Sequence, residues 1–72
     1  MINNELEIRY INPLLDAICK HNKVGIQFTS ARGDTIQDIY CPIHIEYSKR
    51  DNLFRCYAYA ENFKAITIIN IE

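Results

Sequence analysis

The chain has 72 residues, which suits one domain rather than two, and 49% of them are hydrophobic, too many for a disordered chain. Eight basic and nine acidic residues give a formal net charge of −1, so any nucleic-acid contact would have to come from a local patch. Apolar runs are too short to span a membrane and the N-terminus does not resemble a signal peptide, so we expect a cytoplasmic protein with free thiols and no membrane partner. A domain this small often needs a second copy or a parent protein for stability.

Residues 3–11 fit two structures. Leu6, Ile8 and Tyr10 alternate with charged residues, which is typical of a half-exposed strand, but a helical lead-in fits almost as well. We therefore divide the chain into an N-terminal lead-in over residues 1–12 and a single domain over residues 13–72.

A helix is predicted over residues 13–22. Asn12 can cap its first turn through a side-chain hydrogen bond, and Pro13 has its φ angle preset for helix. The apolar face has 3/4 spacing and is formed by Leu14, Leu15, Ile18 and Cys19.

From residue 24 onward the hydrophobic period changes from 3.6 to 2, which indicates strands. Ile36 and Ile39 are out of phase, which suggests a bulge, and Pro42 marks an edge, bend or bulge. Gly33 is free to take a positive φ in the turn over residues 30–34. The expected strands cover residues 24–29, 35–41, 43–47, 53–59 and 63–71. This order predicts a mainly β fold, a small curled five-stranded barrel with one N-terminal α-helix, whose closure would remove its exposed edges.

Several short motifs resemble the WYL domain of bacterial transcription regulators and phage-defence proteins. Ile26-Gln27-Phe28 matches its I-x-Y segment, Gly33 its turn glycine and Pro42 its proline, while Phe54-Arg55-Cys56 stands where the family has Trp-Tyr-Leu, and Tyr57-Ala58-Tyr59 is similar to the L-A-Y that follows. The resemblance implies an Sm-like or SH3-like barrel that senses a ligand or nucleic acid and regulates transcription.

At two places the sequence lacks arginines that the family has. Asp38 stands where the family usually has an arginine, and the last strand, Ile66 to Ile71, lacks the arginines of the family's F-R-L-D-R-I. Those arginines are what the family is thought to use to hold nucleic acid or a nucleotide-like effector.

The strand over residues 53–59 carries the candidate binding site. If Phe54, Cys56 and Ala58 fill the core, then an outward stripe of one cation and two aromatic rings can stack bases and contact phosphate. The candidate residues are Arg55, Tyr57 and Tyr59, with His44, Gln27 and Lys64 beside them. The expected partner is a nucleotide-like effector or single-stranded nucleic acid. The alternative is a cross-strand aromatic ladder that the helix or another chain covers.

Metal binding and catalysis find little support in the sequence. The candidate metal ligands Cys19, His21, Cys41, His44 and Cys56 include no C-x-x-C pair, and their spacing sends neighbours to opposite sides of a helix or strand. No phosphate loop or convincing nucleophile with a base is present, so we expect no enzyme and no cofactor. Two hypotheses remain: a WYL-like sensing domain attached to a DNA-binding module, or a protein-interaction or oligomerisation module without ligand binding.

Overall fold

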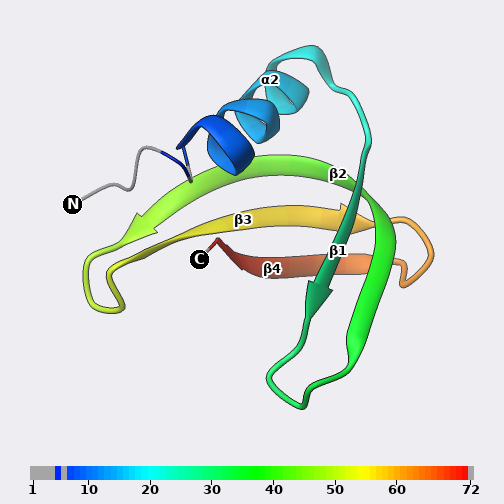
Figure 1. Ribbon diagram of the computed structural model, residues 1–72. Helices are drawn as coiled ribbons and strands as arrows, with labels where there is room; N and C mark the ends of the chain where they lie inside the picture. The colour runs from blue at the N-terminus through cyan, green and yellow to red at the C-terminus, as the bar shows by residue number, and fades with distance from the viewer. Residues whose placement is uncertain (1–4, 6, 72) are drawn as a thin grey trace.

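The computed structural model describes residue 5 and residues 7–71 and shows one helical segment beside one antiparallel sheet (Figure 1). The helical segment consists of η1, a π-helical turn over Glu7–Ile11, and the α-helix α2 over Asn12–Lys20. The strands follow as β1 (Val24–Thr29), β2 (Thr35–Ser48), β3 (Leu53–Ala60) and β4 (Ala65–Ile71), in the sheet order β1-β2-β3-β4. The mainly β fold with one helix is confirmed, but the chain forms four strands rather than five.

The start of the helix differs from the prediction. Asn12 does not cap it, because η1 leads directly into α2 and the capping position falls on Ile11, which has helical dihedral angles and no side-chain hydrogen bond. The helix ends at Lys20, and His21 adopts a left-handed conformation with φ of 56°. Of the ambiguous segment 3–11, residues 7–11 are helical, whereas residues 3, 4 and 6 lie outside the described residues.

The strands predicted over residues 35–41 and 43–47 are one strand, β2. Pro42 pairs with Ala58 and His44 with Tyr57, so Ile43 is one extra residue in a β-bulge. The bulge accommodates the missing N–H of proline and bends the strand instead of ending it. One long strand therefore pairs with β1 through its first half and with β3 through its second half.

The bulge predicted from Ile36 and Ile39 does not occur there. The register between β1 and β2 runs without a shift from Val24 opposite Tyr40 to Thr29 opposite Thr35. Ile36 and Ile39 lie on opposite faces of β2 and break the alternation of buried and exposed residues, because both remain exposed, at 38% and 45%. The end of the β1–β2 hairpin projects away from the other strands, so neither of its faces is fully covered (Figure 1).

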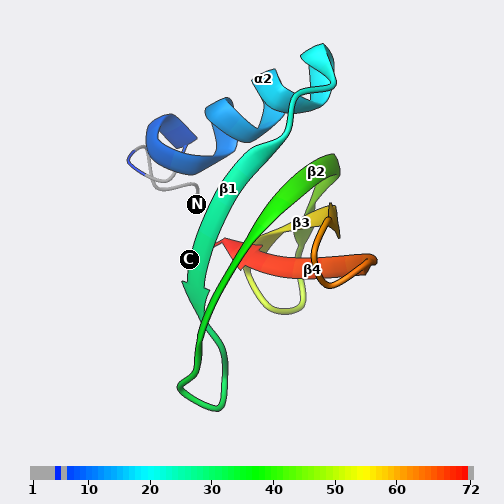
Figure 2. The ribbon, with the colours of Figure 1, turned by 90° about the vertical axis from the view of Figure 1, so that its right-hand side faces the viewer.

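The sheet curls strongly, but it does not close into the predicted barrel. In the described part of the chain β1 pairs only with β2 and β4 pairs only with β3, so each keeps one edge without a strand partner. The end of β4 points towards the middle of β1 (Figure 2). The helix α2 lies over β2 and covers neither edge completely (Figure 1). Among the described residues, no helix is long and apolar enough to cross a bilayer.

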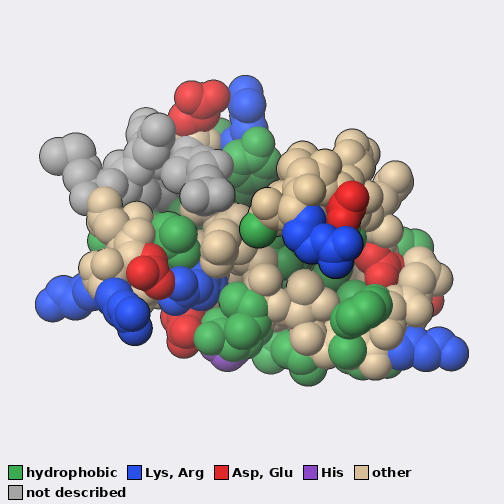
Figure 3. Space-filling view, turned by 90° about the horizontal axis from the view of Figure 1, so that it is seen from below, with side chains coloured by type: hydrophobic (Ala, Val, Ile, Leu, Met, Phe, Trp, Pro, Cys, Tyr) green, Lys and Arg blue, Asp and Glu red, His purple; other side chains and the backbone are tan. Residues whose placement is uncertain are grey.

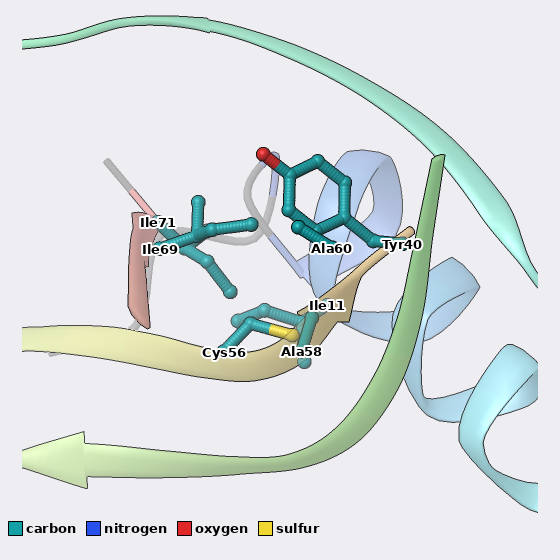
Figure 4. Packing of buried hydrophobic residues seen from close by; sticks show 7 residues of the cluster. All are labelled: Ile11, Tyr40, Cys56, Ala58, Ala60, Ile69 and Ile71. Atoms are coloured by element: carbon teal, nitrogen blue, oxygen red, sulfur yellow. The ribbon is translucent and has the colours of Figure 1, made fainter. Parts of the chain in front are cut away.

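The core inside the curled sheet combines small side chains from β3 with large ones from other elements. Cys56, Ala58 and Ala60 are almost fully buried on the inner side of β3 (Figure 4). Tyr40 from β2 is the largest fully buried side chain, with 2% of its surface exposed. The remaining members of this cluster are Ile11, Ile69 and Ile71.

A buried carboxylate anchors the turn between β3 and β4. Asp38 on β2 accepts hydrogen bonds from its neighbour's amide at Ile39 (2.6 Å), from the amide and side chain of Asn62 (3.1 and 2.9 Å) and from the amide of Phe63 (3.0 Å). Burial by itself would raise the pKa of Asp38, but these hydrogen bonds outweigh it and hold the pKa below the ordinary value of 3.8. Asp38 is therefore a structural anchor of this turn.

Candidate interaction surface

The predicted alternation along β3 is confirmed. Cys56 and Ala58 are buried and Phe54 packs against the core, whereas Arg55 and Tyr57 are partly exposed and Tyr59 is exposed. Three of the predicted site residues thus lie in a row on the outside of the sheet.

Arg55 is already paired within the domain. Its guanidinium forms an ion pair with Asp51 in the β2–β3 turn, and its Nε donates to Oδ1 of Asn70 on β4 at 3.3 Å. A phosphate would therefore have to displace a carboxylate to reach this cation, which makes the outward stripe a weak anion site.

Tyr57 forms a polar cluster with two residues of β2. Its ring stacks on His44, with centroids 4.5 Å apart and an interplanar angle of 14°. Its hydroxyl donates to Glu46 at 2.7 Å, and this hydrogen bond raises the pKa of Tyr57 above its ordinary value. The His44 imidazole lies 3.7 Å from the second carboxylate oxygen of Glu46. Glu46 lies opposite Arg55 in the strand pairing, so a negative charge stands beside the cation of the stripe.

The other two predicted site residues lie elsewhere. Gln27 is on β1, which is separated from β3 by β2, and Lys64 is in the β3–β4 turn, beyond the far end of β3 from Arg55. β2 thus lies between Gln27 and the stripe, whereas the amide of Lys64 donates to the carbonyl of Ala60, the residue after Tyr59, at 2.7 Å.

An apolar surface that was not predicted from the sequence lies beside the stripe. On β4, Ile66 and Ile68 point outward and are 56% and 53% exposed, while Tyr59 is 42% exposed. Ile66 lies opposite Tyr59 and Ile68 lies opposite Tyr57, so the four side chains adjoin across the two strands. We call Tyr57, Tyr59, Ile66 and Ile68 the outer face. The signal was present in the β4 sequence, where isoleucine occurs at both odd and even positions and a strand must turn some of them outward.

The exposed apolar surface extends beyond the start of β4 into the β3–β4 turn. Phe63 in the β3–β4 turn is 74% exposed, although its amide is held by Asp38. The space-filling view from below shows hydrophobic side chains that reach the surface in neighbouring clusters between charged ones (Figure 3). Contiguous exposed apolar surface of this kind marks interaction sites in small domains.

A second feature is a cleft of about 880 Å³ between the two open edges of the sheet. One wall is β1 and the turn after it, the opposite wall is the end of β4, and η1 and α2 cover one end. Gln27 lines this cleft together with Ile26 and Phe28, facing Ile69 and Ile71. The cleft is the consequence of the sheet curling without closing.

No metal site is formed by the residues that the structure describes, because nowhere among them do three or more His, Cys, Asp or Glu side chains gather. Cys19 is exposed, Cys41 is half-buried and Cys56 is buried, and all three are free thiols. Burial raises the pKa of the Cys56 thiol, which makes it a poor nucleophile.

Comparisons of the chain with protein-family models, with curated proteins and with solved structures gave no match. The resemblance to WYL domains stays a prediction from the sequence motifs.

Proposed function

We propose that this protein is an interaction domain that self-associates through the outer face. The observation that carries the proposal is the contiguous set of exposed side chains Tyr59, Ile66 and Ile68 on two paired strands. Within this proposal the protein works in the cytoplasm, where its three free thiols stay reduced.

The unequal distribution of large side chains supports a partner for this face. The buried hydrophobic residues include three alanines and one cysteine, while six isoleucines are at least 38% exposed. A domain of this size has little stability to spare, and burying aliphatic surface contributes about 25 cal/mol for each Å² removed from water. Association therefore adds apolar burial that the isolated chain lacks.

The charges near the outer face favour a second copy as the partner. Arg55 and Asp51 lie side by side at one end, with Glu46 and His44 next to them, so the rim carries both signs. Such a rim can pair with itself across a two-fold axis, where each positive group meets a negative one. With a formal net charge of only −1, two copies do not repel one another.

Sedimentation velocity over a range of protein concentrations tests the proposal with two matched variants. Ile66→Lys places a charge in the outer face, at a residue that does not line the cleft, and is expected to leave a monomer at all concentrations. Ile8→Lys makes the same exchange at a similarly exposed position on η1 (65%) and is expected to associate like the wild type. A wild-type protein that stays monomeric at high concentration would contradict the proposal.

Ligand sensing of the WYL type is a second candidate, because the stacked rings of His44 and Tyr57 beside Arg55 offer a surface on which a base can stack. Fluorescence titration with short single-stranded oligonucleotides at low and high salt tests it. Binding that weakens in salt and is lost in Tyr57→Ala and Arg55→Ala would support it, and no binding at low salt would exclude single-stranded nucleic acid. A regulator of this kind would also require an attached DNA-binding module.

A further inference from the structure

We infer that the cleft between β1 and β4 binds one extended strand of a partner protein, which adds to the open edges of the sheet. This surface shares only Ile68 with the outer face, and the inference does not depend on self-association.

The two walls of the cleft are strand edges with backbone groups available for pairing. Among the described strands β1 has only β2 as a neighbour and β4 has only β3. An extended peptide satisfies such an edge with a row of backbone hydrogen bonds, whatever its side chains. Folded proteins usually protect open edges with charged residues or proline. Neither β1 (Val-Gly-Ile-Gln-Phe-Thr) nor β4 (Ala-Ile-Thr-Ile-Ile-Asn-Ile) contains one.

The shape of the cleft selects a single strand over other occupants. Every residue from Val24 to Ala31 lines it, so it follows the whole of β1, a length of about 20 Å for six strand residues. A compact small molecule would leave much of that length empty. The edge of a second folded copy would have to enter between two facing walls, with η1 and α2 across one end.

The lining also specifies the chemistry of the strand. On the β1 wall, the half-buried side chains of Val24, Ile26 and Phe28 project into the cleft. On the β4 wall, Ile69 and Ile71 project into it (Figure 4). Arg9 is the one charged side chain among the lining residues that the structure describes, and it pairs with Glu5 at 3.3 Å. The cleft therefore favours an uncharged strand with β-branched or aromatic residues at alternate positions.

Amide hydrogen exchange with a synthetic peptide tests the inference. The probe is a heptapeptide of alternating threonine and valine with lysines at both ends, and its control has proline at two of the threonine positions, which removes N–H donors but little apolar surface. We expect the probe to slow exchange of amides in β1 and β4 at least fivefold, and the proline peptide to have no effect.

Two variants with equal charge locate the binding site. Phe28→Lys puts a cation among the half-buried side chains that project into the cleft and is expected to weaken peptide binding about tenfold. Ile36→Lys adds the same charge on β2, directly opposite Phe28 and outside the lining of the cleft, and is expected to change binding less than twofold.

Three results would overturn the inference. Equal binding of the proline peptide would show an apolar pocket without strand pairing. Faster exchange in β4 would show that the peptide displaces β4 instead of adding to the sheet. Protection of β1 and β4 that rises with protein concentration without peptide, in an Ile66→Lys variant whose outer face is blocked, would assign the cleft to a second copy.

Discussion

The inner and outer sides of β3 differ in a way that opposes the usual distribution of side chains. Inside, Cys56, Ala58 and Ala60 are almost completely buried and small, and the large buried side chains of the core come from other elements. Outside, Tyr59 is large and 42% exposed, beside Ile68 of β4 at 53%. Because hydrophobic stabilisation scales with the apolar area buried, the outer side leaves apolar area in water that a partner can cover.

The largest expected effect is a difference in the free energy of unfolding between substitutions of two tyrosines on adjacent strands, Tyr40 and Tyr59. Tyr40→Ala removes the largest buried side chain and should cost about 3–5 kcal/mol, most of the stability of a small domain, so the variant should be largely unfolded. Tyr59→Ala, on the outer face, should cost less than about 1 kcal/mol at low protein concentration. Urea unfolding followed by circular dichroism measures both. Equal losses of unfolding free energy in the two variants would contradict the described difference between the buried core and the exposed outer face.

A smaller effect is expected from the anchor of the β3–β4 turn, which holds the two strands in register. Asp38→Ala leaves the amides of Asn62 and Phe63 without their acceptor and should lower the melting temperature by roughly 5–15 °C. Thermal unfolding by circular dichroism measures this loss. Asp38→Asn keeps one acceptor oxygen and should lose less. An unchanged melting temperature in Asp38→Ala would show that the turn does not depend on the carboxylate.

The smallest effect is a dependence on pH. Because the pKa of Asp38 is lower in the folded than in the unfolded chain, its contribution is fully present above the ordinary value of 3.8 and is lost as the pH falls through the folded value. The urea midpoint should therefore decline below about pH 4 in the wild type. The decline should be shallower in Asp38→Asn.

Asp34→Asn, in the exposed turn after β1, serves as the control and should follow the wild-type curve. A variant at Asp38 with the same acid dependence as the wild type would assign that dependence to other carboxylates.

The features that could be predicted from the sequence depend on local periodicity. The alternation along β3 correctly placed Arg55 outside and Cys56 inside, and Gly33 has the expected positive φ of 89°. Neither outcome requires knowledge of distant contacts, since side chains in a strand alternate and glycine tolerates positive φ.

The errors concern tertiary arrangement. Of the edge, bend or bulge expected at Pro42, the structure shows a bulge, which keeps residues on both sides of the proline in one strand, so the prediction of two strands was wrong. The prediction of a closed barrel was wrong as well, since β1 and β4 do not pair. The role of Asp38 depends on amides 24 and 25 residues away in the chain, which no local pattern indicates. The contacts of Arg55 with Asp51 and Asn70 likewise could not be predicted from the sequence, because they depend on how the strands and their turn are arranged.

The central claim is that a second copy covers the outer face, and the concentration dependence of thermal stability tests it most directly. If folding and association are coupled, the wild-type melting temperature should rise by about 3–6 °C for each tenfold increase in protein concentration. The melting temperature of Ile66→Lys should be the same at every protein concentration. A wild-type melting temperature that does not change with concentration would contradict the claim.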